Sequence, residues 1–177
     1  MKTIFLLRHA KSSWSDPSTD DFERPLNERG KRNAAQIGTY LAENSILPDV
    51  ILCSPAARAQ ETLSLIRPYL PENQTFMVNN ELYLASAVTI LNFIEQVKET
   101  ASSVMIIAHN PGLHELALNL AGRKNIGVSP LLNRVMQKYP TGALALAICE
   151  TQNWANLTQN PSSLVDFVCP EDLPPVI

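Results

Sequence analysis

Three short apolar runs in this 177-residue chain, each ending at a polar or charged residue, constrain its fold more than any other feature. They lie within residues 2–7, 50–53 and 104–108. A run of strand-forming residues without polar alternation is typical of a strand buried on both faces, as in a parallel sheet. Stretches with helical periodicity, such as residues 28–43, lie between these runs. This alternation predicts an α/β sandwich with a mostly parallel central sheet.

Capping residues indicate where the helices begin. Asn27 is expected to cap the helix over 28–43, and Ser86 is expected to begin another helix. A cap followed by proline predicts two further helix starts, at Ser54-Pro55 and Asn110-Pro111. A short helix and two late strands are expected at residues 131–138, 143–148 and 164–168.

The composition is that of an ordinary globular chain. The formal net charge is −3, so no basic field attracts nucleic acid. Cys53, Cys149 and Cys169 lie in apolar runs, which is typical of small core residues in a reducing compartment and not of a disulfide framework. The N-terminal apolar run is too short for a signal peptide, and no stretch approaches the roughly 20 apolar residues that cross a bilayer. We expect one cytoplasmic domain over residues 1–177, with no membrane or nucleic-acid partner.

Charged side chains follow three of the predicted strands. Arg8 and His9 end the first, Arg58 lies just inside the helix after the second, and His109 follows the strand at 104–108. Because ligands bind beyond the carboxyl ends of parallel strands, we expect these side chains to share one crevice. Two helix N-termini should point into it, and both they and the paired donors of two arginines suit an anion. The pattern favours a site for a phosphoryl group.

A neutral imidazole can attack a phosphoryl group and carry it as a covalent phosphohistidine. His9 is the expected nucleophile because it leaves its strand directly beside Arg8. His109 is expected to donate to a phosphate oxygen, so the two imidazoles must differ in environment. His114, about one turn into the next helix, is interpreted as a surface residue. Arginines and histidines supply the charge that metals provide elsewhere, so neither a metal nor a cofactor is expected.

Four segments of the chain resemble the histidine phosphatase superfamily, which includes phosphoglycerate mutases and acid phosphatases. The segments read LRHAKS at 7–12, RPLNERG at 24–30, SPAARAQET at 54–62 and AHNPG at 108–112. The chain is most similar to the small SixA-like phosphohistidine phosphatase branch, and PTGA at 140–143 and Trp154 extend the resemblance over nearly the whole chain.

The resemblance implies roles for residues and a fold. It implies that His9 is the phosphorylated nucleophile and that Arg8, Arg58 and His109 complete the phosphate pocket. The implied fold is a three-layer α/β/α sandwich of the phosphoglycerate mutase-like type, with helices on both faces of the sheet. The spans between the motifs hold only the predicted strands and helices, so no large cap domain is expected.

Three positions depart from the superfamily's pattern. The glycine that usually follows the first histidine is Ala10. Many members carry a phosphate-contacting asparagine where this chain has Ser15. The aspartate that follows the second histidine in acid phosphatases is Asn110 here. Ser15 and Asn110 are therefore kept as candidate substrate or pocket contacts, and the general acid has to come from elsewhere.

Glu81 is the expected general acid, because mutase-like members take a glutamate from the loop after the corresponding strand. The alternative is a solvated loop carboxylate. Among the other acids, Asp21 or Glu23 is expected to pair with Arg24. Glu61 is expected to orient the arginine three residues before it on the same helix.

The absence of a cap predicts an open site that accepts a phosphate displayed on a protein surface. The resemblance points to phosphohistidine in a signalling or phosphotransfer protein. Two alternatives remain open: a phosphatase for small phosphomonoesters such as sugar phosphates, and a non-catalytic phosphate-binding module. Mutase activity is a weaker alternative, because no cap is available to retain a bisphosphate intermediate. Residues 123–140 could add a partial wall to the site.

Overall fold

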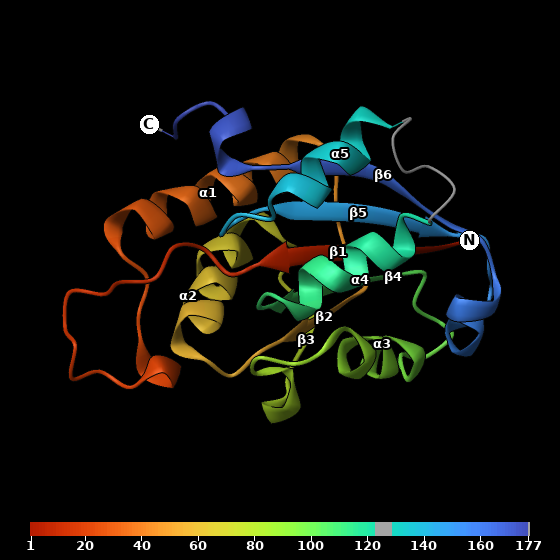
Figure 1. Ribbon diagram of the computed structural model, residues 1–177, viewed down its shortest axis with the longest axis horizontal. Helices are drawn as coiled ribbons and strands as arrows, with labels where there is room; N and C mark the ends of the chain where they lie inside the picture. Colours follow the sequence, from red (N-terminus) through yellow and green to blue (C-terminus); the bar gives the residue numbers. More distant parts are fainter. Residues whose placement is uncertain (123–128, 177) are drawn as a thin grey trace.

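The computed structural model describes residues 1–122 and 129–176. Within them, six strands form one sheet in the order β3-β2-β4-β1-β5-β6 (Figure 1). Strands β1, β2, β3 and β4 are parallel, and β5 runs antiparallel to both of its neighbours. The strands are β1 (Lys2–Arg8), β2 (Val50–Cys53), β3 (Thr75–Val78), β4 (Ser103–Ala108), β5 (Leu144–Cys149) and β6 (Ser162–Val168). The mostly parallel sheet and both late strands are confirmed.

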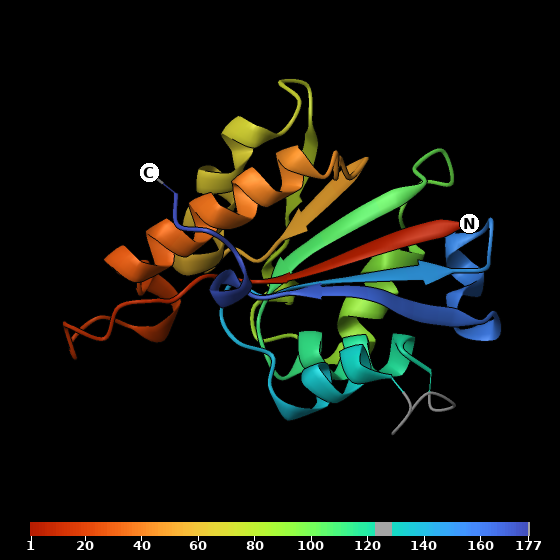
Figure 2. The ribbon, with the colours of Figure 1, turned by 90° about the horizontal axis from the view of Figure 1, so that it is seen from above.

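Helices cover both faces of this sheet, as the two views show (Figures 1 and 2). On one face, α1 (Glu28–Glu43) and α2 (Ala57–Ile66) pack against alternate residues of β1, Phe5 and Leu7. On the other face, Ile4 and Leu6 share a core with the remaining helices. These are α3 (Ala87–Glu95), α4 (Gly112–Leu120) and α5 (Pro130–Gln137). Because successive strand residues point to opposite faces, one central strand contributes to both cores. The three-layer α/β/α sandwich is confirmed, and it has no large cap.

Two of the predicted helix caps are confirmed. The Asn27 side chain accepts from the backbone N–H of Gly30 at the start of α1. Ser86 caps α3 by accepting from Thr89 N. The short helix expected at 131–138 is α5, which begins after the capping residue Ser129. Residues 123–128 of the stretch proposed as a partial wall lie outside the described residues.

The helices predicted after Ser54-Pro55 and Asn110-Pro111 are present as α2 (Ala57–Ile66) and α4 (Gly112–Leu120), but neither Ser54 nor Asn110 is the N-cap. Helix α2 begins at Ala57, two residues after Pro55, and α4 begins at Gly112. Ser54 lies instead within hydrogen-bonding distance of His109, because strand β4 ends beside strand β2. The Asn110 amide donates to the carbonyl of Tyr139. Both polar side chains therefore serve contacts between distant segments, which a local capping pattern does not encode.

The carboxyl ends of the central strands are aligned at one edge of the sheet. Arg8 pairs with Ala108 across β1 and β4, and Cys53 pairs with Ile107 across β2 and β4. The ladder continues for one residue, since His9 N donates to the Ala108 carbonyl. The residues that directly follow β1, β2 and β4 are thus held side by side.

The three cysteines are free and buried, as expected. Among the described residues, no helix is both long and apolar enough to cross a bilayer.

Candidate active site

The His9 ring lies at the aligned strand edge, and its contacts define its tautomer. His9 Nδ1 is 2.7 Å from the carbonyl oxygen of Ala10, so Nδ1 carries the proton and donates it. His9 Nε2 is then an acceptor, and Arg58 Nε donates to it at 3.3 Å. The nitrogen with the free lone pair is therefore the one beside the arginine. A nucleophilic attack on an anion held by Arg58 would come from Nε2.

Burial sets the charge of this imidazole. His9 is 6% exposed, and burial lowers its pKa to about 3. The positive charges of Arg58, Arg8 and Arg24 lower the pKa further, while the Ala10 carbonyl opposes them. The ring is consequently neutral at physiological pH, which is the form that can act as a nucleophile.

The ring of His109 lies 5.0 Å from that of His9, centroid to centroid. Its Nε2 is 2.7 Å from Ser54 Oγ, and that hydroxyl accepts weakly from Ala56 N at 3.4 Å. If the Ser54 proton goes to Nε2, then Nδ1 carries the proton of the neutral ring. Nδ1 is buried and has no hydrogen-bond partner among the described residues. It is available to donate to an anion in the site.

Burial also lowers the pKa of His109 to about 3, and the neighbouring His9 and Arg58 add to the effect. Both rings are thus neutral, but for different uses. The Nδ1 proton of His9 is held by a backbone carbonyl, whereas Nδ1 of His109 has no hydrogen-bond partner among the described residues. The expected difference in environment is visible in these hydrogen bonds.

Asp21 anchors Arg58, which the sequence did not indicate. Arg58 Nη2 donates to Asp21 Oδ2 at 3.0 Å, and Arg58 Nη1 donates to the Asp21 backbone carbonyl. Asp21 Oδ1 accepts from Arg24 Nη2 at 2.6 Å, so the expected pairing with Arg24 is confirmed. The hydroxyl of Tyr83 donates to Oδ2. That hydrogen bond and the two arginines hold the pKa of Asp21 well below its usual range. Asp21 is therefore ionised and is a poor proton donor.

Arg8 and Asn110 are tethered to one carbonyl group. Arg8 Nη1 donates to the Tyr139 carbonyl at 2.7 Å, and Asn110 Nδ2 donates to it at 3.0 Å. Arg8 Nε and Asn110 Oδ1 are buried without partners among the described residues. An oxyanion beside Arg8 would give the guanidinium its missing acceptor.

A cavity of about 420 Å³ brings these groups together. Its cationic side chains outnumber Asp21, its single carboxylate, so an anion fits it. Five of the predicted site residues, Arg8, His9, Arg58, His109 and Asn110, line it. The other lining residues are Lys11, Ser12, Trp14, Asp21, Arg24, Leu84 and Thr141. Across residues 1–122 and 129–176, no group of three or more His, Cys, Asp or Glu side chains could hold a metal ion.

Two of the predicted residues are not brought into this cavity. Glu81 lies in a 3-10 turn at Asn80–Leu82, and its side chain is exposed. Ser15 is exposed too, with its hydroxyl 2.8 Å from that of Ser13. Neither residue lines the cavity. Their proposed roles as acid and phosphate contact stay predictions.

Two residues that follow Arg58 on α2, Glu61 and Thr62, bind segments that surround the site. Glu61 accepts from the backbone N–H of Leu26 at 2.9 Å, so the expectation that it orients Arg58 is wrong. Its side chain faces the segment before α1, and Asp21 binds the arginine instead. Thr62 accepts from Ala10 N and donates to the Arg58 carbonyl, which ties α2 to the segment after His9. His114 is held outside the cavity, with Nε2 2.7 Å from the Val135 carbonyl.

The sequence did not identify Ser54, Tyr83 or Trp14 as residues of the site. Ser54 carried a capping signal, and Tyr83 and Trp14 carried none. Trp14 is 71% exposed, and the Arg24 guanidinium lies 3.5 Å from its ring centroid. For Asp21 a signal was available in the sequence, because a run of acidic residues lies between two motifs that contain arginine.

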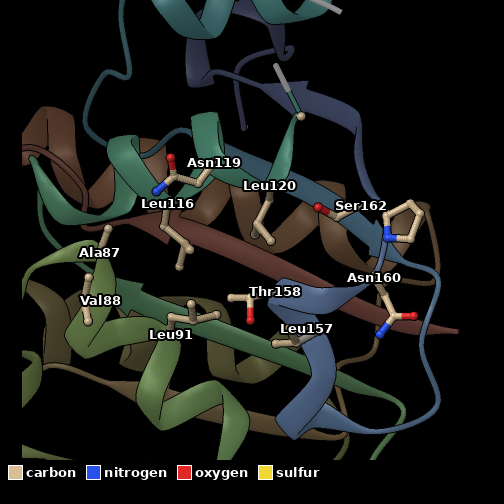
Figure 3. Close-up of a pocket in the computed structure, with 12 residues that line it drawn as sticks. Ala87, Val88, Leu91, Leu116, Asn119, Leu120, Leu157, Thr158, Asn160 and Ser162 are labelled. Carbon is tan, nitrogen blue, oxygen red and sulfur yellow. The ribbon is translucent and has the colours of Figure 1, made fainter. Parts of the chain in front are cut away.

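A larger cavity, of about 720 Å³, lies away from these groups, among α3, α4 and the 3-10 segment Trp154–Gln159 (Figure 3). It is mainly apolar, and none of its lining residues is titratable. Val88 of α3 is 67% exposed and lines this cavity. With no charged or titratable side chain in its lining, the cavity offers neither a proton donor nor a site for an anion.

Comparisons with known proteins agree with the geometry. The profile of the histidine phosphatase superfamily (branch 1) matches residues 4–80. The chain is 30% identical to an uncharacterized protein of Mycobacterium tuberculosis, over 93% of this chain and 99% of that protein. Its fold is similar to that of a candidate phosphohistidine phosphatase SixA from Agrobacterium tumefaciens, with a TM-score of 0.80 and 30% identity over 96% and 98% of the two chains. A second candidate SixA, from Nakamurella multipartitia, gives a TM-score of 0.82 at 25% identity over 99% and 97%.

Proposed function

Because the chain belongs to the histidine phosphatase superfamily, we propose that it is a phosphatase that hydrolyses phosphohistidine in proteins through a covalent intermediate on His9. The observation that carries the proposal is the state of His9. Its imidazole is neutral, its Nδ1 proton is fixed by the Ala10 carbonyl, and its Nε2 lies beside Arg58 in a cationic cavity. A site that only bound phosphate would need the cations but not this nucleophile.

The first step transfers the phosphoryl group to the protein. His9 Nε2 attacks phosphorus, an N–P bond forms, and the bond from phosphorus to the substrate's imidazole nitrogen breaks. The second nitrogen of the substrate's ring carries a proton, so this ring leaves as a neutral imidazole. Arg8 and Arg58 bind the equatorial oxygens, and His109 Nδ1 donates to a third. Arg8 Nε and His109 Nδ1 are buried nitrogen atoms without hydrogen-bond partners among the described residues.

The second step returns His9 to its starting state. Water attacks phosphorus, and the bond from phosphorus to His9 Nε2 breaks. Both protons of the water leave with the inorganic phosphate. The Ala10 carbonyl holds the Nδ1 proton throughout, so His9 returns to its neutral form when the phosphate leaves. The same residues hold the phosphoryl group in both steps, since both transfers pass through similar charge distributions.

A weak proton donor is compatible with this substrate. The leaving group of phosphohistidine is an imidazole, which takes a proton readily near neutral pH. Asp21 is too acidic to supply one, and Glu81 lies outside the cavity lining. A phosphate ester, whose alkoxide leaving group needs a proton, would depend much more on an acid such as Glu81.

The surroundings of the cavity support a protein substrate. No large cap covers it, and two hydrophobic side chains at its rim, Trp14 and Leu84, are 71% and 53% exposed. Exposed apolar side chains around a polar site are suited to contact with a protein surface. The similarity to two candidate SixA phosphatases supports the same substrate class.

Hydrolysis assays on a phosphohistidine-bearing protein and on a panel of sugar phosphates test the proposal. We expect kcat/KM to favour the phosphoprotein, and we expect H9A to abolish turnover and any acid-labile phosphoenzyme. H114A is the matched control, because His114 lies outside the cavity. A marked preference for sugar phosphates would reassign the substrate to small phosphomonoesters. Full turnover by H9A would refute the mechanism.

A further inference from the structure

A second, smaller cavity adjoins the one that contains His9. Its volume is about 210 Å³, and it shares Arg8, Lys11 and Thr141 with the larger cavity. The two are therefore neighbours along a common wall. The remaining lining residues are Arg29, Asn33, Lys138, Pro140, Cys169, Pro170 and Glu171.

Three exposed cations line this second cavity, and we call Lys11, Arg29 and Lys138 the cationic annex. Within the described parts of the chain, none of the three forms a salt bridge. Glu171 is the only carboxylate in the lining. Like charges gathered in one hollow repel one another, and an anion placed among them removes that cost.

The fold brings these cations together from separate elements. Lys11 follows β1, Arg29 lies in the first turn of α1, and Lys138 follows α5. The approach of α1 to Lys11 is close, since Asn27 N donates to the Lys11 carbonyl at 3.0 Å. A Cβ atom at Gly30 would lie 2.1 Å from that same carbonyl oxygen, so only glycine permits the approach.

We propose that the cationic annex binds a second anionic group, a carboxylate, carried by the same substrate molecule whose phosphate occupies the neighbouring cavity. The inference rests on the proposed function, because it takes the His9 cavity as the phosphate site. In a phosphoprotein substrate, the group is an acidic side chain near the phosphohistidine.

The shared wall explains why both anions belong to one molecule. Arg8 and Lys11 face both hollows, so a ligand that fills the first lies against the opening of the second. Asp21 and Glu171, one in each cavity, are the carboxylates that oppose an anion, and in each cavity the cations outnumber them. The annex therefore favours substrates with acidic neighbours without requiring a deep pocket.

Binding of unreactive ligands tests the annex independently of turnover. The probes are ω-phosphonocarboxylates with one, two or three methylene groups, each compared with the alkylphosphonate of equal length by titration calorimetry. We expect at least one phosphonocarboxylate to bind about fivefold more tightly than its uncharged counterpart. R29M and K138M should each reduce that ratio about two- to threefold, and added salt should reduce it as well.

R32M is the matched control, because Arg32 is exposed one turn along α1 and lines neither cavity. It should leave the ratio unchanged. Equal affinities for the two ligand series, a ratio that R29M and K138M leave intact, or no binding of any phosphonate would overturn the annex. Turnover is a separate result. Hydrolysis that depends on His9, without a preference for carboxylate ligands, would support the proposed function and refute the annex. A preference for carboxylate ligands without turnover would support the annex and refute the proposed function.

Discussion

Asp21 accepts a hydrogen bond from Arg58 at 3.0 Å, and so binds the same guanidinium that donates to the nucleophilic nitrogen of His9. Arg58 thereby lies between an internal anion and the reacting group. All three of its nitrogen atoms donate within the protein, two to Asp21 and one to His9. A phosphate that enters the cavity must share or displace the Asp21 contacts.

Replacing Asp21 with asparagine should strengthen anion binding. The variant D21N removes the single carboxylate of the cavity lining, so Arg58 and Arg24 lose their competing partner. We expect inorganic phosphate to bind about three- to tenfold more tightly, as measured by calorimetry. D20N is the control, because the neighbouring Asp20 does not line the cavity. Weaker binding by D21N would mean that Asp21 orients Arg58 more than it competes with phosphate.

The two buried imidazoles should make the protein less stable in acid. The pKa values of His9 and His109 are about 3 in the folded protein, against about 6.5 in an unfolded chain. Between these values the unfolded chain binds protons that the folded protein excludes. The free energy of unfolding is therefore highest above about pH 6.5 and falls as the pH is lowered, by up to about 1.4 kcal/mol per pH unit for each ring.

Urea unfolding at a series of pH values measures this slope. The variant H9N should show a shallower dependence between about pH 4.5 and 6.5, because one of the two rings is gone. A slope identical to that of the parent protein would show that His9 is already protonated in the folded state or contributes nothing to the dependence.

Gly30→Ala should destabilise the fold where α1 meets the segment after His9. The added Cβ would lie 2.1 Å from the Lys11 carbonyl oxygen, and backbone on both sides limits relaxation. We expect a loss of about 2–3 kcal/mol in the free energy of unfolding. G38A, in the same helix, meets the ring of Tyr69, a side chain that can rotate away. Its loss should be smaller, and an equal loss in both variants would contradict the argument.

Glu81→Gln should separate the two kinds of substrate. Phosphohistidine hydrolysis is expected to stay within about twofold of the parent rate, because the leaving imidazole needs little help. If Glu81 supplies a proton, hydrolysis of an alkyl phosphate should fall about a hundredfold. Steady-state kinetics on both substrates, with the exposed Glu72→Gln variant as control, measure the difference. A loss of equal size on both substrates would count against this role.

The strand ends were the most predictable part of the site. Arg8, His9 and His109 follow apolar runs that had to be buried strands, and parallel packing then places those runs' ends at one edge. Arg58 entered by the same reasoning, as the second residue of α2. No knowledge of side-chain contacts was needed for these four.

The contacts made across the cavity could not be predicted in the same way. Asp21 reaches Arg58 because the loop before α1 folds back over the strand ends, and no local periodicity encodes that path. Ser54 and Asn110 carried capping signals, but His109 and Tyr139 offered them tertiary partners. A local hydrogen bond is one of several available to such side chains, and packing decides among them.

The position of β1 has a consequence for how the protein is made. The first strand of the chain lies between β4 and β5, and its Lys2 pairs with Cys149. A nascent chain therefore emerges with the strand that leads to His9 long before either of its neighbours exists. Until β4 and β5 have been synthesised, β1 lacks the strands with which it pairs in the folded sheet. Pairings between segments so far apart in the sequence also form slowly. We infer that the phosphate site assembles only once the ribosome has released most of the chain.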